Sequence, residues 1–149
     1  MRAVILLLFS AVSAVAPSDG GAGDKDHDRM QGTWVLTKLE VDAKDAPKTT
    51  SDTNWIFKGE KLKNVREGKT TFEGTFKLQP TKSPAQIDIM ITAAAGENEK
   101  KLVGMTTKGI YSFDGETLKL CLGATGGDRP AKFSTEGEGY RVLYLKRSK

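Results

Sequence analysis

The chain has 149 residues, a formal net charge of +4 and a single cysteine. This length suits one domain, and one cysteine excludes an internal disulfide, so a hydrophobic core must hold the domain together. Basic and acidic side chains are interspersed, and the aromatic residues follow strand spacing, which argues against nucleic-acid binding. The mild positive charge instead favours solubility or attraction to anionic surfaces.

Residues 1–16, MRAVILLLFSAVSAVA, combine one basic residue, an apolar run and a tail of small residues. This pattern is typical of a secretory signal peptide, and the run is shorter than the roughly 20 apolar residues of a membrane span. An N-terminal anchor that stays attached is the alternative. Cleavage after Ala16 fits the A-x-A form of residues 14–16, although Pro17 could impede it, and cleavage after Ser13, after Ala14 or a little later fits equally well. We expect an exported, periplasmic or extracellular monomer with no stable membrane span.

Residues 17–29 are expected to form a flexible linker and a short turn ahead of a folded domain at 30–149. The acidic start of the segment DKDHDRMQ could cap a short helical turn that ends near Gly32. Four side chains of metal-ligating types lie here: Asp24, Asp26, His27 and Asp28. With one imidazole beside a linker, a solvated acidic turn is the favoured interpretation, and no metal or other cofactor is predicted.

The rest of the chain alternates apolar and polar residues in short segments that are separated by turns. Strands are expected at 33–41, 54–58, 60–66, 70–79, 87–91, 101–107, 110–113, 117–122, 133–136 and 140–146. No long stretch has a helical period. About nine or ten short strands at this spacing predict an all-β antiparallel meander, closed into a barrel or stacked as a sandwich, and closure removes exposed edges.

The stretch GIYSFDGETLKLCLG is the strongest hairpin signal, because Asp-Gly at 114–115 suits a tight turn with positive φ. A two-residue turn there would pair Phe113 with Glu116 and Tyr111 with Leu118. The apolar face of this hairpin would then carry Tyr111, Phe113, Leu118, Leu120 and Leu122. That face needs a core, which the other strands can supply.

Alternation in the first strand places Trp34 and Leu36 on one face and Leu39 on the other. In the strand at 70–79, Gly74 on the inner face suggests a bend or bulge of the kind that barrel closure requires. Cys121 is expected to be an inert, small strand residue.

Six stretches between residues 30 and 147 occur in this order: MQGTWVLTKLEVD, WIFKGEKL, GTFKLQPTKSPAQIDI, GIYSFDGETLKLC, GGDRPAKF and VLYLKR. In these stretches the chain resembles the lipocalin-like domain family of secreted planctomycete proteins. The resemblance implies export and a lipocalin-like β-barrel of about 8–10 strands. It implies no chemistry, because that family has no established activity. Asp42-Ala43 stands where the family usually has Asp-Gly, so that turn is expected to differ.

Gly32-x-Trp34 at the first strand is similar to the lipocalin pattern, in which the tryptophan packs across the closed end of the barrel. A basic residue of the last strand lies over its ring in that family. Here Arg147 or Lys146 could take this position, at about 0.5–2 kcal/mol for a cation–π contact. A core tryptophan without a cationic partner is the alternative. The role assigned to Gly32, Trp34 and Arg147 is structural.

The motifs give little support to catalysis. The only histidine lies in the predicted linker, which excludes a Ser-His-Asp or Cys-His site inside the domain, and no zinc-binding spacing occurs. GATGG at 123–127 lacks the Gly-Lys-Ser/Thr of a phosphate loop. Asp128-Arg129 in that loop could bind an anionic group, but a local salt bridge is the favoured interpretation. An enzyme is therefore the least favoured class.

Two function classes remain. The first is a binding module that holds a small apolar or amphipathic ligand in the barrel. Its tentative lining residues are Leu36, Phe57, Phe72, Phe76, Ile89, Tyr111, Phe113, Leu118 and Leu120. The alternative is a cell-envelope interaction or accessory domain with a filled core, which would contact its protein partner through loops 42–53 and 123–132. A ligand barrel should hold a cavity of roughly 300 Å³ or more, open at one end.

Overall fold

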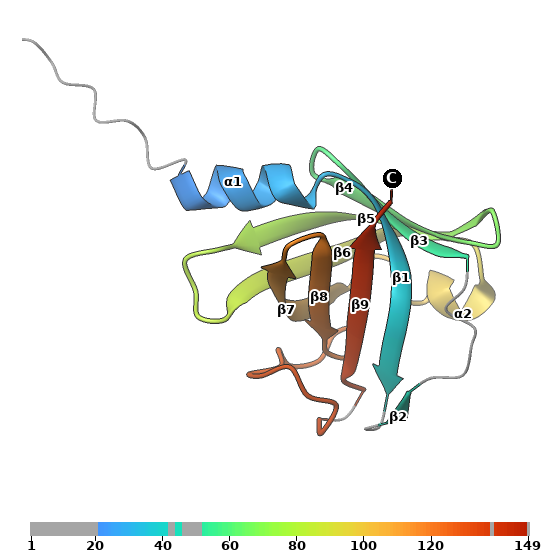
Figure 1. The fold of residues 1–149 in the computed structure, drawn as a ribbon. Helices are drawn as coiled ribbons and strands as arrows, with labels where there is room; N and C mark the ends of the chain where they lie inside the picture. The colour runs from blue at the N-terminus through green and yellow to red at the C-terminus, as the bar shows by residue number, and fades with distance from the viewer. Residues whose placement is uncertain (1–20, 42–43, 46–51, 138, 149) are drawn as a thin grey trace, which may run out of the picture.

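The computed structural model describes residues 21–41, 44–45, 52–137 and 139–148. Its strands pair antiparallel in chain order, and β1 (Gly32–Val41) also pairs with β9 (Arg141–Arg147), so the sheet closes into a barrel (Figure 1). The two-residue β2 (Lys44–Asp45) is appended to β1 outside the ring. The predicted antiparallel meander barrel is confirmed. The predicted signal peptide and most of the loop 42–53 lie outside the described residues.

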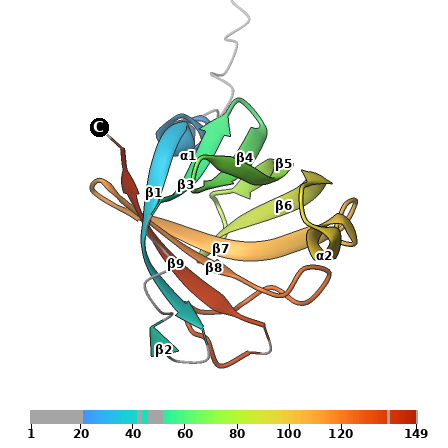
Figure 2. The ribbon, with the colours of Figure 1, turned by 90° about the vertical axis from the view of Figure 1, so that its right-hand side faces the viewer.

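The remaining ring strands are β3 (Thr53–Lys58), β4 (Lys61–Arg66), β5 (Lys69–Gln79), β6 (Ala85–Ala94), β7 (Thr106–Asp114) and β8 (Thr117–Leu122). Two helices accompany them, α1 (Gly21–Met30) before β1 and the single-turn α2 (Glu97–Lys100) before β7, well separated in space (Figure 2). Neither of these helices in the described chain is long and apolar enough to cross a bilayer. Two predicted strands were wrong: most of 101–107 is turn, and 133–136 is irregular.

Helix α1 lies across one end of the barrel, where only a linker and a short turn were expected (Figure 1). Tertiary contacts explain the difference. Met30 is fully buried, the hydroxyl of Tyr111 donates to the Asp26 carboxylate at 2.6 Å, and the His27 ring stacks on Phe76 with centroids 5.8 Å apart. Burial, and then the bond to Asp26, raise the pKa of Tyr111 above its ordinary value. Asp26 and His27, which the sequence offered as possible metal ligands, therefore contact the barrel.

Trp34 closes the barrel beneath α1. The side chain is fully buried, and its indole N–H donates to the Met30 carbonyl at 2.8 Å. The guanidinium carbon of Arg147 lies 4.3 Å from the Trp34 ring centroid, which is cation–π geometry. Of the two basic residues considered for this position, Arg147 occupies it, whereas Lys146 is exposed.

Arg147 also fastens the helix to the barrel. Its two terminal nitrogens donate to the carbonyls of Gln31 at 2.9 Å and Arg29 at 2.5 Å, and its Nε lies 3.4 Å from the Glu116 carboxylate. Gly32 lies beneath it with φ of +111°, and a Cβ there would stand 3.3 Å from Arg147 Nη1. Glycine suits this position because an L side chain would be strained and would crowd the guanidinium.

The β7–β8 hairpin forms with a register that differs from the predicted one. Phe113 pairs with Leu118 and not with Glu116. Tyr111 likewise pairs with Leu120, two residues beyond the predicted Leu118. The loop residues are therefore Gly115 and Glu116, and only Gly115 has positive φ, at +57°. Because side chains alternate with a period of two, a two-residue shift leaves the faces unchanged. The predicted apolar face accordingly points into the core.

A bulge in β1 corrects the predicted alternation of that strand. Leu36 pairs with Leu145, and Lys38 pairs with the adjacent Tyr144, which leaves Thr37 as the extra residue. Beyond the bulge the alternation switches, so Leu39 packs on the inner core together with Leu36. Strict alternation had placed Leu39 on the opposite face.

A bulge lies at the expected Gly74, but its extra residue belongs to the neighbouring strand. Glu73 pairs with Ala93 and Gly74 pairs with Ile91, which leaves Thr92 of β6 as the extra residue. The extra residue of β5 itself is Thr71, in its pairing with β4. Gly74 is buried, and a Cβ there would lie 2.5 Å from the Met90 carbonyl oxygen. The backbones thus approach each other more closely than any side chain allows.

The segment after β8 covers part of the outer face of the barrel. Arg129 pairs with Asp88 at 2.5 Å and donates to the Gly109 carbonyl at 2.7 Å, so the predicted salt bridge to Asp128 was wrong. Beneath this segment, Cys121 is fully buried and its thiol donates to the Ser134 carbonyl at 3.5 Å. Burial raises the pKa of the Cys121 thiol, which fits an inert residue.

We predict that Arg147→Gln lowers the free energy of unfolding by about 1–3 kcal/mol, since it removes a cation–π contact and charged hydrogen bonds to two carbonyls. Urea denaturation followed by tryptophan fluorescence measures this. Lys146→Gln removes the same charge from the outer face of β9 and should change stability by less than about 0.5 kcal/mol. Equal effects of the two variants would contradict the anchoring role.

Candidate functional site

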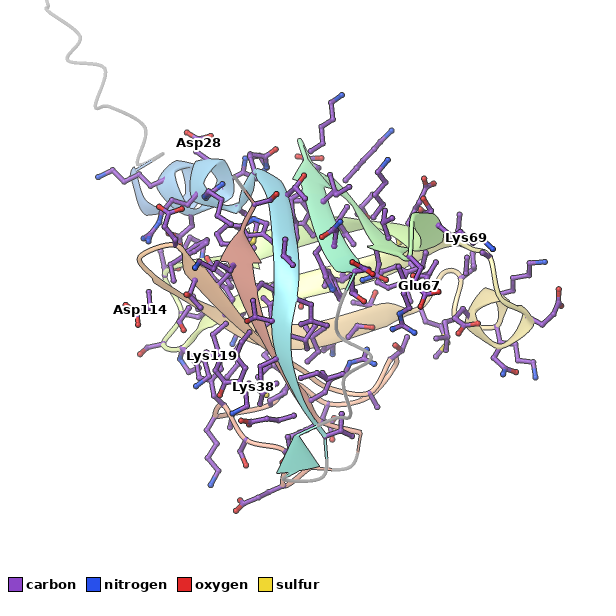
Figure 3. The ribbon with its side chains drawn as sticks, turned by 45° about the vertical axis from the view of Figure 1, so that its right-hand side comes forward. Asp28, Lys38, Glu67, Lys69, Asp114 and Lys119 are labelled. Carbon is purple, nitrogen blue, oxygen red and sulfur yellow. The ribbon has the colours of Figure 1, made fainter. Side chains whose placement is uncertain are left out.

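The inward-facing side chains change from apolar to polar along the barrel axis. Four strands show the change, written from the α1 end: Phe57, Trp55, Thr53 in β3; Leu62, Asn64, Arg66 in β4; Tyr111, Gly109, Thr107 in β7; Leu145, Leu143, Arg141 in β9. In Figure 3, Asp28 and Asp114 lie on the α1 side, whereas Glu67 and Lys69 mark the β4–β5 turn on the α2 side. The two ends of the barrel therefore differ in chemistry.

A cavity of about 250 Å³ lies inside the barrel at the α2 end. This is slightly below the range of roughly 300–1,000 Å³ that is usual for ligand pockets, so a small ligand would fit. Its apolar lining consists of Leu36, Leu39, Trp55, Phe72, Ile89, Ile91, Leu102, Leu122 and Leu143. Its polar lining consists of Thr53, Asn64, Arg66, Thr71, Glu99, Thr107, Thr125 and Arg141.

The deep polar groups of the cavity are mostly paired with each other. The Thr71 hydroxyl donates to Asn64 Oδ1 at 2.6 Å, and the hydroxyls of Thr107 and Thr125 lie 2.8 Å apart. Thr53 is the exception: it is 1% exposed, and its hydroxyl has no hydrogen-bond partner among the described residues. A buried polar group without a partner costs about 1–3 kcal/mol, so this hydroxyl is a position where a ligand atom could bind favourably.

Charged side chains surround the entrance of the cavity. Arg66 and Arg141 line it and are solvent-exposed as whole residues, as is Glu99. Within the described chain, no salt bridge or side-chain hydrogen bond involves either arginine. Packed atoms around Arg141 lower its pKa by desolvation, although arginine remains protonated. We call Arg66, Arg141 and Glu99 the rim; its formal charge is +1.

The predicted lining residues all contribute to the inner core, but only some reach the cavity. Leu36, Phe72 and Ile89 line it. The others fill the α1 half of the barrel as close-packed core: Phe57, Phe76, Tyr111, Phe113, Leu118 and Leu120. Rings in that half contact each other directly, as Phe57 and Phe76 do at 5.1 Å between centroids.

Sequence reasoning missed the polar part of the site. Thr53, Asn64 and Arg66 stand at inward positions, and so do Thr107 and Arg141. The available signal was alternation that places a polar residue where an apolar one is expected, at or near the start of β3, β7 and β9 and at the end of β4. Only the closed topology shows that these strand ends meet at one place.

A second hollow of about 630 Å³ follows β3 to β6 and is lined mainly by outward-facing residues, including Lys58, Lys61, Lys63 and Glu73. These side chains are exposed, and no buried polar group without a partner lines this hollow in the described chain. It is larger than the interior cavity, but its exposed, flexible lysines provide no preorganised site. The interior cavity is therefore the stronger candidate.

We predict that Thr53→Val leaves the free energy of unfolding unchanged or raises it by about 1 kcal/mol, because the variant removes a buried hydroxyl without a partner and keeps the side-chain shape. Thr71→Val is the matched control and should lower stability by about 1–2 kcal/mol, since it deprives Asn64 of its donor. Urea denaturation measures both. A loss for Thr53→Val equal to that for Thr71→Val would mean that the Thr53 hydroxyl is already satisfied.

No protein-family model, no curated protein and no solved structure matches this chain. The function of the cavity is therefore inferred from its own residues.

Proposed function

We propose that this chain is an exported, monomeric, lipocalin-like binding module that holds a small apolar or amphipathic ligand in the interior cavity. The main observation is the buried Thr53 hydroxyl, which has no hydrogen-bond partner in the described part of the chain and lines a cavity of about 250 Å³. Natural cores rarely leave such a group unpaired, and a ligand that supplies the missing partner would gain binding energy.

The two kinds of lining support an amphipathic occupant. Trp55, Ile89 and Leu143 offer apolar surface inside the barrel, and the polar groups gather toward the α2 end. Ligand sites typically combine a mainly apolar wall with a few polar groups that fix orientation. The filled α1 half supports this arrangement as a rigid scaffold, because close-packed aromatic rings resist rearrangement.

A cell-envelope accessory domain without a ligand is the second candidate. Its support is that half of the barrel is filled and that the cavity is smaller than most ligand pockets. Of its proposed contact loops, 42–53 lies mostly outside the described residues. The other, 123–132, is partly occupied by its own barrel, since Arg129 is bound to Asp88 and Pro130 is buried. This loop therefore offers less free surface than its length suggests.

Native mass spectrometry of the protein purified from its own cells tests the binding module. We expect a retained small molecule on the wild-type protein. Ile91→Phe should reduce its occupancy at least about tenfold, because the larger ring enters the cavity that Ile91 lines. Ile56→Phe makes the same substitution on the outer side of β3 and should keep the adduct. A wild-type protein that carries no adduct and takes up no added amphipath would favour the accessory domain.

Export is tested at the N-terminus. We expect the protein recovered outside the cytoplasm to begin after Ser13, Ala14 or Ala16, because signal peptidase cuts after small residues. N-terminal sequencing of the mature protein measures this. An intact Met1 on that protein would contradict cleavage and leave the retained anchor as the explanation.

A further inference from the structure

We infer that the occupant of the cavity is a small amphipathic anion whose acid group binds Arg66 and Arg141 while its apolar part enters the barrel. The inference rests on the proposed function and names the ligand class for it. The observation behind it is that two arginines line the entrance of a mainly apolar cavity, and no carboxylate of the described chain pairs with them.

The other arginines of the described chain all have partners. Arg29 lies over the Phe113 ring at 4.4 Å, Arg129 pairs with Asp88, and Arg147 binds Trp34 and two carbonyls. Arg66 and Arg141 are different, because nothing in the described chain contacts their guanidinium groups by hydrogen bond or salt bridge. Among the arginines of the described chain, the two unpaired guanidinium groups are thus those that line the cavity entrance.

Their position on the sheet fixes where these side chains emerge. Arg66 is paired in register with the inward-facing Thr53, and Arg141 is paired with the inward-facing Leu122. Directly opposite residues in antiparallel strands project from the same face of the sheet, so both arginines belong to the interior face. Both arginines lie at the α2 end of the barrel interior, where inward-facing residues are polar. Toward α1, the inward-facing residues become apolar.

Guanidinium chemistry selects the acid group. The planar fork donates two parallel hydrogen bonds to a carboxylate or a similar oxyanion, which a neutral hydroxyl cannot match and a cation would oppose. Arg141 lines the cavity beside the buried Leu122 and Leu143, and a bond to an oxyanion at such an apolar wall is less weakened by water than one on an open surface. Glu99 reduces the positive charge of the rim without cancelling it.

The cavity also limits size. A volume of about 250 Å³ is below that of usual drug-sized pockets, which disfavours nucleotides and long-chain lipids held entirely inside. Trp55, Ile89 and Leu143 form an apolar wall that a short alkyl or aryl group could cover. A medium-chain carboxylate therefore matches both the charge at the entrance and the wall behind it.

Isothermal titration of the full mature chain with hexanoate, octanoate and decanoate tests the ligand class. 1-Octanol and octylammonium are the matched neutral and cationic probes. We expect at least one carboxylate to bind about tenfold more tightly than 1-octanol, and octylammonium more weakly than either. Trp55 lines the cavity, so its fluorescence should respond on binding, and Trp55→Phe should abolish that response.

Substitutions in the rim test which of its residues bind the acid group of the ligand. Arg66→Gln and Arg141→Gln should each weaken carboxylate binding about tenfold and leave 1-octanol binding unchanged, because only the anion uses the guanidinium groups. Glu99→Gln should tighten carboxylate binding, since it removes a like charge. Lys146→Gln removes a positive charge from the outer face of β9 and should have no effect. Circular dichroism confirms that each variant is folded.

The outcomes separate the two proposals. If 1-octanol binds as tightly as the carboxylates, or if the arginine variants bind octanoate as the wild type does, the anion inference is wrong and the binding module stands. If no probe binds and native mass spectrometry finds no adduct, the binding module itself is wrong, and the inference falls with it.

Discussion

The contact between Arg147 and Trp34 joins the last strand to the first strand and to the helix that precedes it. Trp34 begins the first strand, Arg147 ends the last, and Arg147 also holds two carbonyls at the end of helix α1. Because β1 pairs with β9, this contact lies at the seam where the sheet closes. The helix, the closed end and the ring of strands thus depend on one guanidinium group and the indole beneath it.

The two halves of the barrel interior differ in how completely side chains fill them. Met30, Trp34 and Tyr111 fill the barrel beneath α1, and each of these side chains is at most 2% exposed. In the α2 half, the described residues leave a cavity, and polar residues such as Thr53, Asn64 and Thr107 share its lining with apolar ones. A small barrel can be solid or hold one ligand. This barrel differs along its axis, with a close-packed core in the α1 half and a cavity in the α2 half.

Sequence analysis predicted the fold well, because alternation with a period of two is a local property. For the same reason, the predicted inward and outward faces of the β7–β8 hairpin were correct although its turn lies elsewhere than predicted. Leu39 was misplaced because one extra residue, Thr37, reverses alternation, and a bulge leaves no clear local signal. Helix α1 was underestimated because its stability comes from Asp26, His27 and Met30 contacting strands far along the chain. The cavity was missed for a related reason: residues such as Thr53 and Arg141 become neighbours only when the ring closes.

The outer segment that covers Cys121 has a consequence for the proposed export, which would bring this thiol into an oxidising space. An accessible lone thiol there would form a covalent bond with a second copy or with a small-molecule thiol. Carbonyls of Lys132 and Ser134 cover the sulfur, and Arg129 ties the same segment to β6 and β7. Local opening of this segment would therefore be needed before the sulfur could crosslink, so its fastening protects the barrel against unwanted disulfide-linked dimers.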